Sequence, residues 1–205
     1  MTKQNLSYMT VEEYLGAEES QPFRREYVDG RVFAMTGATA AHNAICTNLL
    51  SLVHAHLRGT GCRAYANDMK VKIESINSFY YPDILVTCEP FSPKAIFTTA
   101  PVLIVEILSP STKHIDRREK VAAYKQISGL KEYLIISQNK HRVEMFQRGD
   151  DDIWQMMVVE GNERLLLKSL SPTLELPLTS IYEGLGIPNM VREEEEAEYD
   201  CDSDY

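Results

Sequence analysis

Two acidic residues interrupt segments of the sequence that otherwise predict buried β-strands. Asp83 lies in Tyr80–Val86 and Glu106 lies in Leu103–Leu108, and most other residues of both segments are aliphatic or aromatic. An ionised carboxylate in an apolar environment is costly unless it is paired or bound to a metal. Two such groups on neighbouring strands would repel each other, whereas a divalent cation favours both. Mg²⁺ is commonly held by one or two carboxylates plus substrate phosphate, so the pair indicates a Mg²⁺ or Mn²⁺ site for phosphodiester chemistry. Pairing of each acid with a Lys or Arg is the alternative explanation.

Pro82-Asp83 followed by Glu106 on the next long strand belongs to a wider set of motifs. These segments are Met9–Tyr14, Glu26–Gly30, His42-Asn43, Tyr81–Val86, Val105–Thr112, Asp116–Lys120 with Tyr124, and Glu132–Ile136. In them the chain resembles the PD-(D/E)xK nuclease superfamily and, more closely, the Uma2-type family (DUF820) of restriction endonuclease-like proteins. The resemblance extends over most of residues 9–147, and Val105–Thr112 is its most specific part.

This resemblance implies an α/β (α+β) fold with a restriction-endonuclease-like core, in which helices flank a mixed central β-sheet. It places Asp83 and Glu106 in the metal positions and implies DNA as substrate and Mg²⁺ or Mn²⁺ as cofactor. By analogy with nucleases that cut both strands as two-fold dimers, it also implies a homodimer.

One position departs from the superfamily motif, which has Lys two residues after the second acid, because this chain has Leu108 there. An ammonium group near the metal would position the attacking water or stabilise the developing charge, so another Lys must supply it. Lys120 is the first choice, since Asp116, Lys120 and Tyr124 repeat every four residues on one helical face. Lys70 and Lys72 share one face of the strand before Asp83 and are alternatives, and a solvated surface position is the plain explanation for each lysine.

Further candidates come from the N-terminal part of the chain and from the segment after Glu106. Glu26 fits the further acid that the superfamily often adds, although a cross-strand pair with Arg31 would also explain it. His42 and Asn43 match the family at a helix start, where phosphate contact, capping or packing are all open, and Asp68 could assist the metal or cap a turn. Ser109, in Ser109–Thr112, could contact phosphate or cap the following helix.

Hydrophobic periodicity, together with helix-capping and turn residues, predicts the helices and strands that position these residues. Thr10–Glu13 is a capping box that opens a helix to about Glu18, and Asp29-Gly30 suits a tight hairpin turn. The remaining pattern predicts helices at Ala40–Arg58 and Asp116–Ser128, and strands at Arg24–Val28, Arg31–Met35, Cys62–Ala66, Met69–Glu74, Phe79–Thr87, Val102–Leu108 and Glu132–Ser137. It ends in a β meander formed by Val143–Gln147, Ile153–Val159 and Arg164–Leu167.

The charge is distributed unevenly along the 205 residues. The formal net charge is −9, of which residues 192–205, with eight acidic residues and one Arg, carry −7. We therefore expect one nuclease-like domain over residues 1–191 and a disordered acidic tail over 192–205. The nearly neutral body and Leu108 favour an alternative function, a catalytically inactive nuclease-fold module for nucleic-acid binding or protein assembly. The exposed strand edges of the meander could also serve oligomerisation.

The location of the protein is predicted from what the sequence lacks. No apolar run approaches the roughly 20 residues of a membrane span, and the first ten residues have no apolar signal core, so we expect a cytoplasmic protein that does not associate with membranes. Cys46, Cys62, Cys88 and Cys201 form no C-x-x-C pair, so we expect no zinc framework and reduced cysteines.

Overall fold

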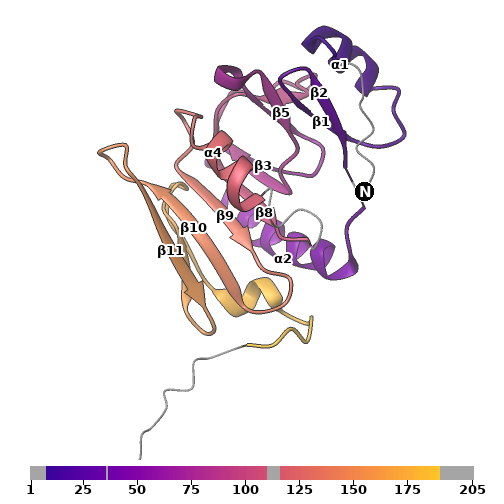
Figure 1. The fold of residues 1–205 in the computed structure, drawn as a ribbon. Helices are drawn as coiled ribbons and strands as arrows, with labels where there is room; N and C mark the ends of the chain where they lie inside the picture. Colours follow the sequence, from indigo (N-terminus) through magenta and orange to yellow (C-terminus); the bar gives the residue numbers. More distant parts are fainter. Residues whose placement is uncertain (1–7, 36, 110–115, 190–205) are drawn as a thin grey trace, which may run out of the picture.

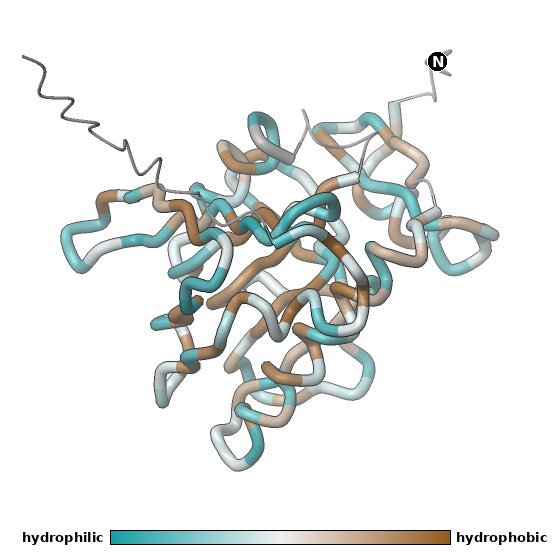
Figure 2. The backbone as a smooth tube through the Cα atoms, turned by 90° about the horizontal axis from the view of Figure 1, so that it is seen from below, coloured by the Kyte–Doolittle hydropathy of each residue, from teal (hydrophilic) through white to brown (hydrophobic). Residues whose placement is uncertain are grey.

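The computed structural model describes residues 8–35, 37–109 and 116–189 and has the predicted α+β architecture (Figure 1). The acidic tail 192–205 and residues 110–115, which include all of the predicted Ser109–Thr112 motif except Ser109, lie outside the described residues. Two mixed β-sheets form the framework, with few helices around them. Apolar residues gather in the centre of the molecule and polar residues on its outer loops (Figure 2). None of the helices in the described part is both long and apolar enough to cross a bilayer.

The larger sheet has six strands, and β8 (Pro101–Ile107) lies in its interior, as the aliphatic run predicts. Its order is β11 (Trp154–Glu160), β10 (Arg142–Arg148), β9 (Glu132–Ile136), β8, β6 (Ile84–Thr87) and β3 (Arg63–Ala66). The β8–β9 pair is parallel and the other pairs are antiparallel.

Each face of this sheet is covered by a different layer. Helix α2 (Ala40–His56) packs Ile45, Leu49 and Val53 against one face, as their helical spacing predicts. The short helix α4 (Val121–Tyr124) and the second sheet cover the other face. Because side chains alternate along a strand, β8 sends Leu103, Val105 and Ile107 to the α2 side and Ile104 to the α4 side.

The smaller sheet has five strands and carries the N-terminal hairpin. Its order is β2 (Arg31–Ala34), β1 (Arg25–Val28), β5 (Ser78–Tyr80), β4 (Lys70–Ile73) and β7 (Phe97–Thr98). The turn between β1 and β2 has positive φ at Asp29 and Gly30, which confirms the predicted hairpin. Helix α1 (Val11–Glu18) begins at the predicted Thr10 capping box and buries Tyr14 against Tyr27 and Phe79.

The predicted continuous strand Phe79–Thr87 is wrong, since the chain forms two strands that belong to different sheets. β5 ends at Tyr80, and β6 begins at Ile84 in the larger sheet. Pro82 explains the break, because its nitrogen cannot donate to a strand ladder and its ring fixes the backbone. The break places Asp83 at the junction of the two sheets.

Two further predictions differ from the structure. The predicted helix Asp116–Ser128 is shorter in the structure, where a π-helical turn, η2 (Asp116–Lys120), is followed only by α4. After α4 the hydrogen bonds span three residues instead of four, from Gln126 N–H to the Ala123 carbonyl and from Ile127 N–H to the Tyr124 carbonyl, so the α-helix ends there. The C-terminal meander is incomplete, because β12 (Arg164–Leu167) pairs with β13 (Leu174–Pro177) rather than with β11. This pairing turns Leu165, Leu167 and Leu176 into the core beneath α2. Two 3₁₀ turns, η1 (Glu74–Ile76) and η3 (Leu178–Tyr182), complete the described elements.

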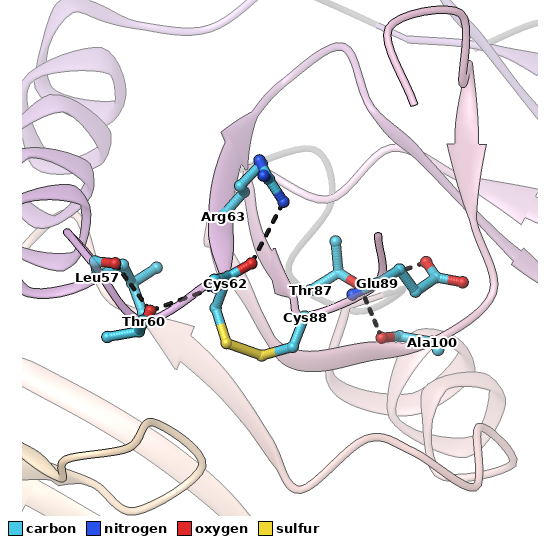
Figure 3. Close-up of a disulfide and its surroundings, with 9 residues drawn as sticks. Leu57, Thr60, Cys62, Arg63, Thr87, Cys88, Glu89 and Ala100 are labelled. Carbon is cyan, nitrogen blue, oxygen red and sulfur yellow. Dashed lines mark hydrogen bonds between the residues drawn. A yellow bond between two sulfur atoms is a disulfide. The ribbon is translucent and has the colours of Figure 1, made fainter. Parts of the chain in front are cut away.

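The prediction of reduced cysteines is wrong for Cys62 and Cys88, which form a disulfide between the ends of β3 and β6 (Figure 3). The β3–β6 register pairs Arg63 with Thr87, and continuing it by one residue sets Cys62 opposite Cys88. A separation of 26 residues does not show this proximity in the sequence. Cys46 is a buried free thiol, and Cys201 lies outside the described residues.

Candidate active site

The candidate site lies where β6 begins and β8 ends. In the antiparallel β6–β8 pair, Ile84 lies opposite Val105, so one further residue of this register sets Asp83 opposite Glu106. Strand alternation turns Glu106 to the face that carries Ile104 and α4. The first turn of α2, which carries His42, reaches Asp83 from the other layer.

Glu106 is buried and receives two donors from the chain that follows β8. Its Oε1 lies 3.0 Å from Lys120 Nζ and accepts a 2.8 Å hydrogen bond from the Tyr124 hydroxyl. Burial, and then the negative charge of Glu106, raises the pKa of Tyr124 well above its ordinary value. The Tyr124 hydroxyl therefore keeps its proton and remains a donor to the carboxylate across the physiological range.

Lys120 joins Glu106 to a third acid from the other sheet. Its Nζ lies 3.0 Å from Glu26 Oε1, and its side chain is only 6% exposed. The ammonium also lies 5.8 Å from the centre of the Tyr80 ring. The β1–β2 register places Glu26 opposite Phe33 rather than Arg31, so the cross-strand pair with Arg31 is not the explanation for this acid.

Asp83 is held by the backbone of β8 and by α2. Its Oδ2 accepts a 2.7 Å hydrogen bond from Ile107 N–H and lies 3.0 Å from His42 Nε2. The other ring nitrogen of His42, Nδ1, is buried and has no partner among the described residues. The Asp83 carbonyl accepts from Asn67 N–H and contacts the Cys46 thiol, whose pKa is raised to about 11 by burial and then by Asp83.

These contacts correct one premise of the sequence argument, that the two buried acids need a metal to neutralise them. Glu106 is neutralised by Lys120, and Asp83 has His42 and a backbone donor. Within the described part of the chain, no three His, Cys, Asp or Glu side chains converge as a ready-made metal site. The Lys120 ammonium therefore joins Glu106 to Glu26, and Asp83 is held separately by His42 and Ile107.

The sequence matches a family model described as "Putative restriction endonuclease", the Uma2 family, over residues 11–179. The chain belongs to the Uma2 family. Two relatives come from Synechocystis sp. (strain PCC 6803). The uncharacterized protein slr1290 is 36% identical over 178 residues, covering 86% of this chain and 93% of the relative. The uncharacterized protein sll1609 is 33% identical over 158 residues, covering 75% of this chain and 88% of the relative.

A solved structure shares the fold. The crystal structure of a "putative nuclease belonging to DUF820" from Anabaena variabilis superposes with a TM-score of 0.69 at 19% identity. The match covers 85% of this chain and 97% of that chain. At this identity the likeness establishes the fold, and the restriction-endonuclease-like core predicted from the motifs is therefore confirmed for this Uma2 chain.

Several predicted site residues of this Uma2 chain lie away from the Glu106–Lys120 cluster. The side chain of Asn43 is exposed on the outer face of α2. Lys72 forms an ion pair with Glu74, and Asp68 forms an exposed one with Arg24, so neither contacts the site acids.

Lys70 and Ser109 have different surroundings. Lys70 is buried on β4, with its Nζ 5.1 Å from the centre of the Tyr81 ring, and burial lowers its pKa. Ser109 is half-buried two residues after β8, close in sequence to Glu106.

Two residues that hold the site together were not predicted to do so. Tyr124 was noted only as a member of the helical face, and its hydrogen bond to Glu106 needed the fold to bring α4 over β8. Gln138 donates to the Leu108 carbonyl at 2.5 Å and accepts from the Thr39 hydroxyl at 2.7 Å. It thereby ties the end of β8 to the N-cap of α2, and no sequence signal distinguishes it from an ordinary surface glutamine.

Proposed function

We propose that this chain is a metal-dependent endonuclease that hydrolyses DNA phosphodiester bonds. The observation that carries the proposal is the position of Lys120, whose ammonium contacts Glu106 and Glu26. The motif lysine is replaced by Leu108, and Lys120 supplies an ammonium beside the second motif acid from the following helix. Membership of the Uma2 family supports the reaction class.

The donor set fits a hard divalent cation of few protein ligands. Asp83 and Glu106 offer carboxylate oxygens at adjacent strand ends, and Mg²⁺ usually keeps several waters and takes substrate phosphate for the rest of its shell. Asp83 Oδ1 makes no hydrogen bond with a described residue, which leaves that oxygen available. We therefore assign Mg²⁺ or Mn²⁺ to Asp83 and Glu106, completed by water and DNA.

Each protein group has a separate role in this proposal. When bound, the cation would polarise the phosphate and lower the pKa of a water. Lys120 would stabilise negative charge that develops on the phosphate, because its ammonium is desolvated and fixed by two carboxylates. Glu26 is then a positioning residue for Lys120, and His42 is one for Asp83.

Nicking of supercoiled plasmid with Mg²⁺ or Mn²⁺ tests the proposal. We expect Asp83→Asn to lower the nicking rate at least 100-fold, as removal of electrostatic stabilisation does at other active sites. Asp152→Asn is the matched control, because Asp152 is an exposed acid paired with Arg148 and should leave the rate unchanged. Equal rates for Asp83→Asn and wild type would reject the assignment.

A second function is favoured by the charge balance of the site. Asp83 and Glu106 already have protein partners, so their charges do not require a bound cation for the fold to be stable. The chain could then serve in nucleic-acid binding or protein assembly without cleaving DNA. A protein that retains DNA but shows neither nicking nor a heat of Mg²⁺ binding in titration calorimetry would fit this second function.

We also propose that the chain acts as a homodimer joined through β11. This strand pairs with β10 over seven consecutive residues, and among the described strands it has no neighbour on its other side (Figure 1). Gln155–Val159 contains no charge and no Pro, and Met156 is 55% exposed, so the edge lacks the usual protection against strand pairing. Sedimentation of Met156→Lys should show monomer where the wild type shows dimer, and a monomeric wild type would exclude the dimer.

A further inference from the structure

A second group of cationic and aromatic side chains lies at the opposite end of α2 from His42. The end of α2, the following glycine turn and the start of β3 enclose a hollow of about 410 Å³. Its lining includes Arg58, Cys62, Arg63, Tyr65 and Phe91. We call this hollow the β3 pocket.

The β3 pocket is positively charged although the chain as a whole carries −9. Arg58 is exposed and forms no ion pair with a described residue, and none of the described residues that line the pocket is acidic. Among the described residues Arg63 donates only to the Gly61 carbonyl, and its guanidinium lies 4.9 Å from the centre of the Phe91 ring. Two arginines without carboxylate partners in the described part of the chain give this hollow a positive charge that favours an anion.

Aromatic surface gives the pocket a second recognition element. Phe91 is 59% exposed, although exposed side chains of this size are costly to leave in water. An arginine stacked on an aromatic ring leaves a planar surface on which a nucleobase can stack. The Cys62–Cys88 disulfide fixes one wall, because Cys62 lines the pocket.

The pocket continues toward the candidate active site along the free edge of β3. A second hollow of about 300 Å³ shares Tyr65 with it and is lined further along by Ala66, Asp68 and Lys70. Asn67, next to Ala66, donates its N–H to the Asp83 carbonyl. With a rise of roughly 3.4 Å per residue, Arg63 lies roughly 10 Å along β3 from Ala66. Ala66 lies opposite Ile84, the residue after Asp83, so the edge of β3 leads from the pocket toward the candidate site.

We propose that the β3 pocket binds a nucleotide of the substrate DNA a few steps from the cleaved bond. Arg58 and Arg63 pair with its phosphate, and Phe91 and Tyr65 stack on its base after the base has left the duplex stack. The inference rests on the proposed function for the identity of the ligand, and it adds the place where the strand is anchored.

Fluorescence anisotropy with a fluorescein-labelled DNA duplex in EDTA tests the pocket without any cleavage. We expect Arg58→Gln/Arg63→Gln to weaken binding about 100-fold, at about tenfold for each charged hydrogen-bonding group. The slope of log affinity against log salt should also fall by about 0.9 for each phosphate that the variant no longer neutralises. The matched control is Arg164→Gln/Lys168→Gln, which removes the same charge from exposed positions on and beside β12.

Phe91→Ala tests the stacking part without disturbing a strand, since Phe91 lies in a segment without regular structure. We expect it to weaken binding about tenfold with an unchanged salt slope. Pocket variants that bind DNA as tightly as the Arg164→Gln/Lys168→Gln control would overturn the inference. If those variants bind normally while wild type nicks plasmid, only the pocket assignment fails. If wild type neither binds nor nicks DNA, the proposed function fails as well.

Discussion

Replacement of Lys120 by Met tests whether its ammonium holds the site together. The change leaves the carboxylates of Glu106 and Glu26 without the cation that lies 3.0 Å from each, and their side chains are 5% and 15% exposed. Removing one partner of a buried ion pair costs about 3–5 kcal/mol, because the other charge stays desolvated. Tyr124 still donates to Glu106, so we expect the lower end, a loss of about 3 kcal/mol in the free energy of unfolding.

A double-mutant cycle separates this charge effect from the loss of packing. In Lys120→Met/Glu106→Gln the group at position 106 is neutral and can still accept from Tyr124, so the loss should shrink to about 2 kcal/mol. The rest of the loss comes from Glu26, which keeps its charge without the Lys120 ammonium but is more exposed than Glu106. Urea unfolding followed by the fluorescence of the single tryptophan, Trp154, measures the free energies. Lys131→Met, at an exposed position, should stay within about 0.5 kcal/mol of wild type. A Lys120→Met variant as stable as Lys131→Met, or a double variant that loses the sum of both single effects, would refute the reasoning.

Three other predictions concern the framework around the site. Tyr124→Phe should lose about 2 kcal/mol of unfolding free energy, because it removes a buried donor to the charged Glu106; urea unfolding checks this, and an unchanged midpoint would contradict it. Reduction of the Cys62–Cys88 disulfide should lower stability by about 3 kcal/mol for a 26-residue separation, and reductant should have no effect on Cys88→Ser. Lys70→Met should raise the free energy of unfolding near pH 7, because burial lowers the pKa of Lys70 and its charged form therefore destabilises the fold. The advantage of the variant over wild type should vanish as the pH rises through the lowered pKa toward 10.5. Urea midpoints between pH 7 and 10.5 measure that difference, and a constant gap between wild type and variant would show that the charge is not its cause.

Local signals in the sequence predicted local structure correctly. The Thr10 capping box, the Asp29-Gly30 turn and the periodicity of Ile45, Leu49 and Val53 each depend on contacts within a few residues or on one buried face, and the structure confirms them. The break at Pro82 was present in the sequence, yet the apolar run on both sides of it suggested one strand, because nothing local shows that two sheets meet there.

The candidate site was predictable in its members and less so in its contacts. Asp83, Glu106, Lys120 and Glu26 were selected from motif and helical spacing, and the fold brings Lys120 onto both glutamates. The partner of Glu26 was expected to be Arg31 or a metal, whereas its actual partner, Lys120, is far away in the sequence, and no pattern in a single sequence specifies such a contact. The disulfide, the Tyr124 hydrogen bond to Glu106 and the role of Gln138 were not predicted for the same reason, because each joins residues that are distant in the sequence.

The central claim is that Asp83 and Glu106 hold a divalent cation in the working enzyme. Electron paramagnetic resonance of free Mn²⁺, titrated into the protein with uncleaved DNA at low temperature, counts the bound ion directly. We expect wild type and Asp152→Asn to remove Mn²⁺ from solution equally, and Asp83→Asn and Glu106→Gln each to remove markedly less. Equal uptake by all four proteins, or no uptake by wild type, would contradict it.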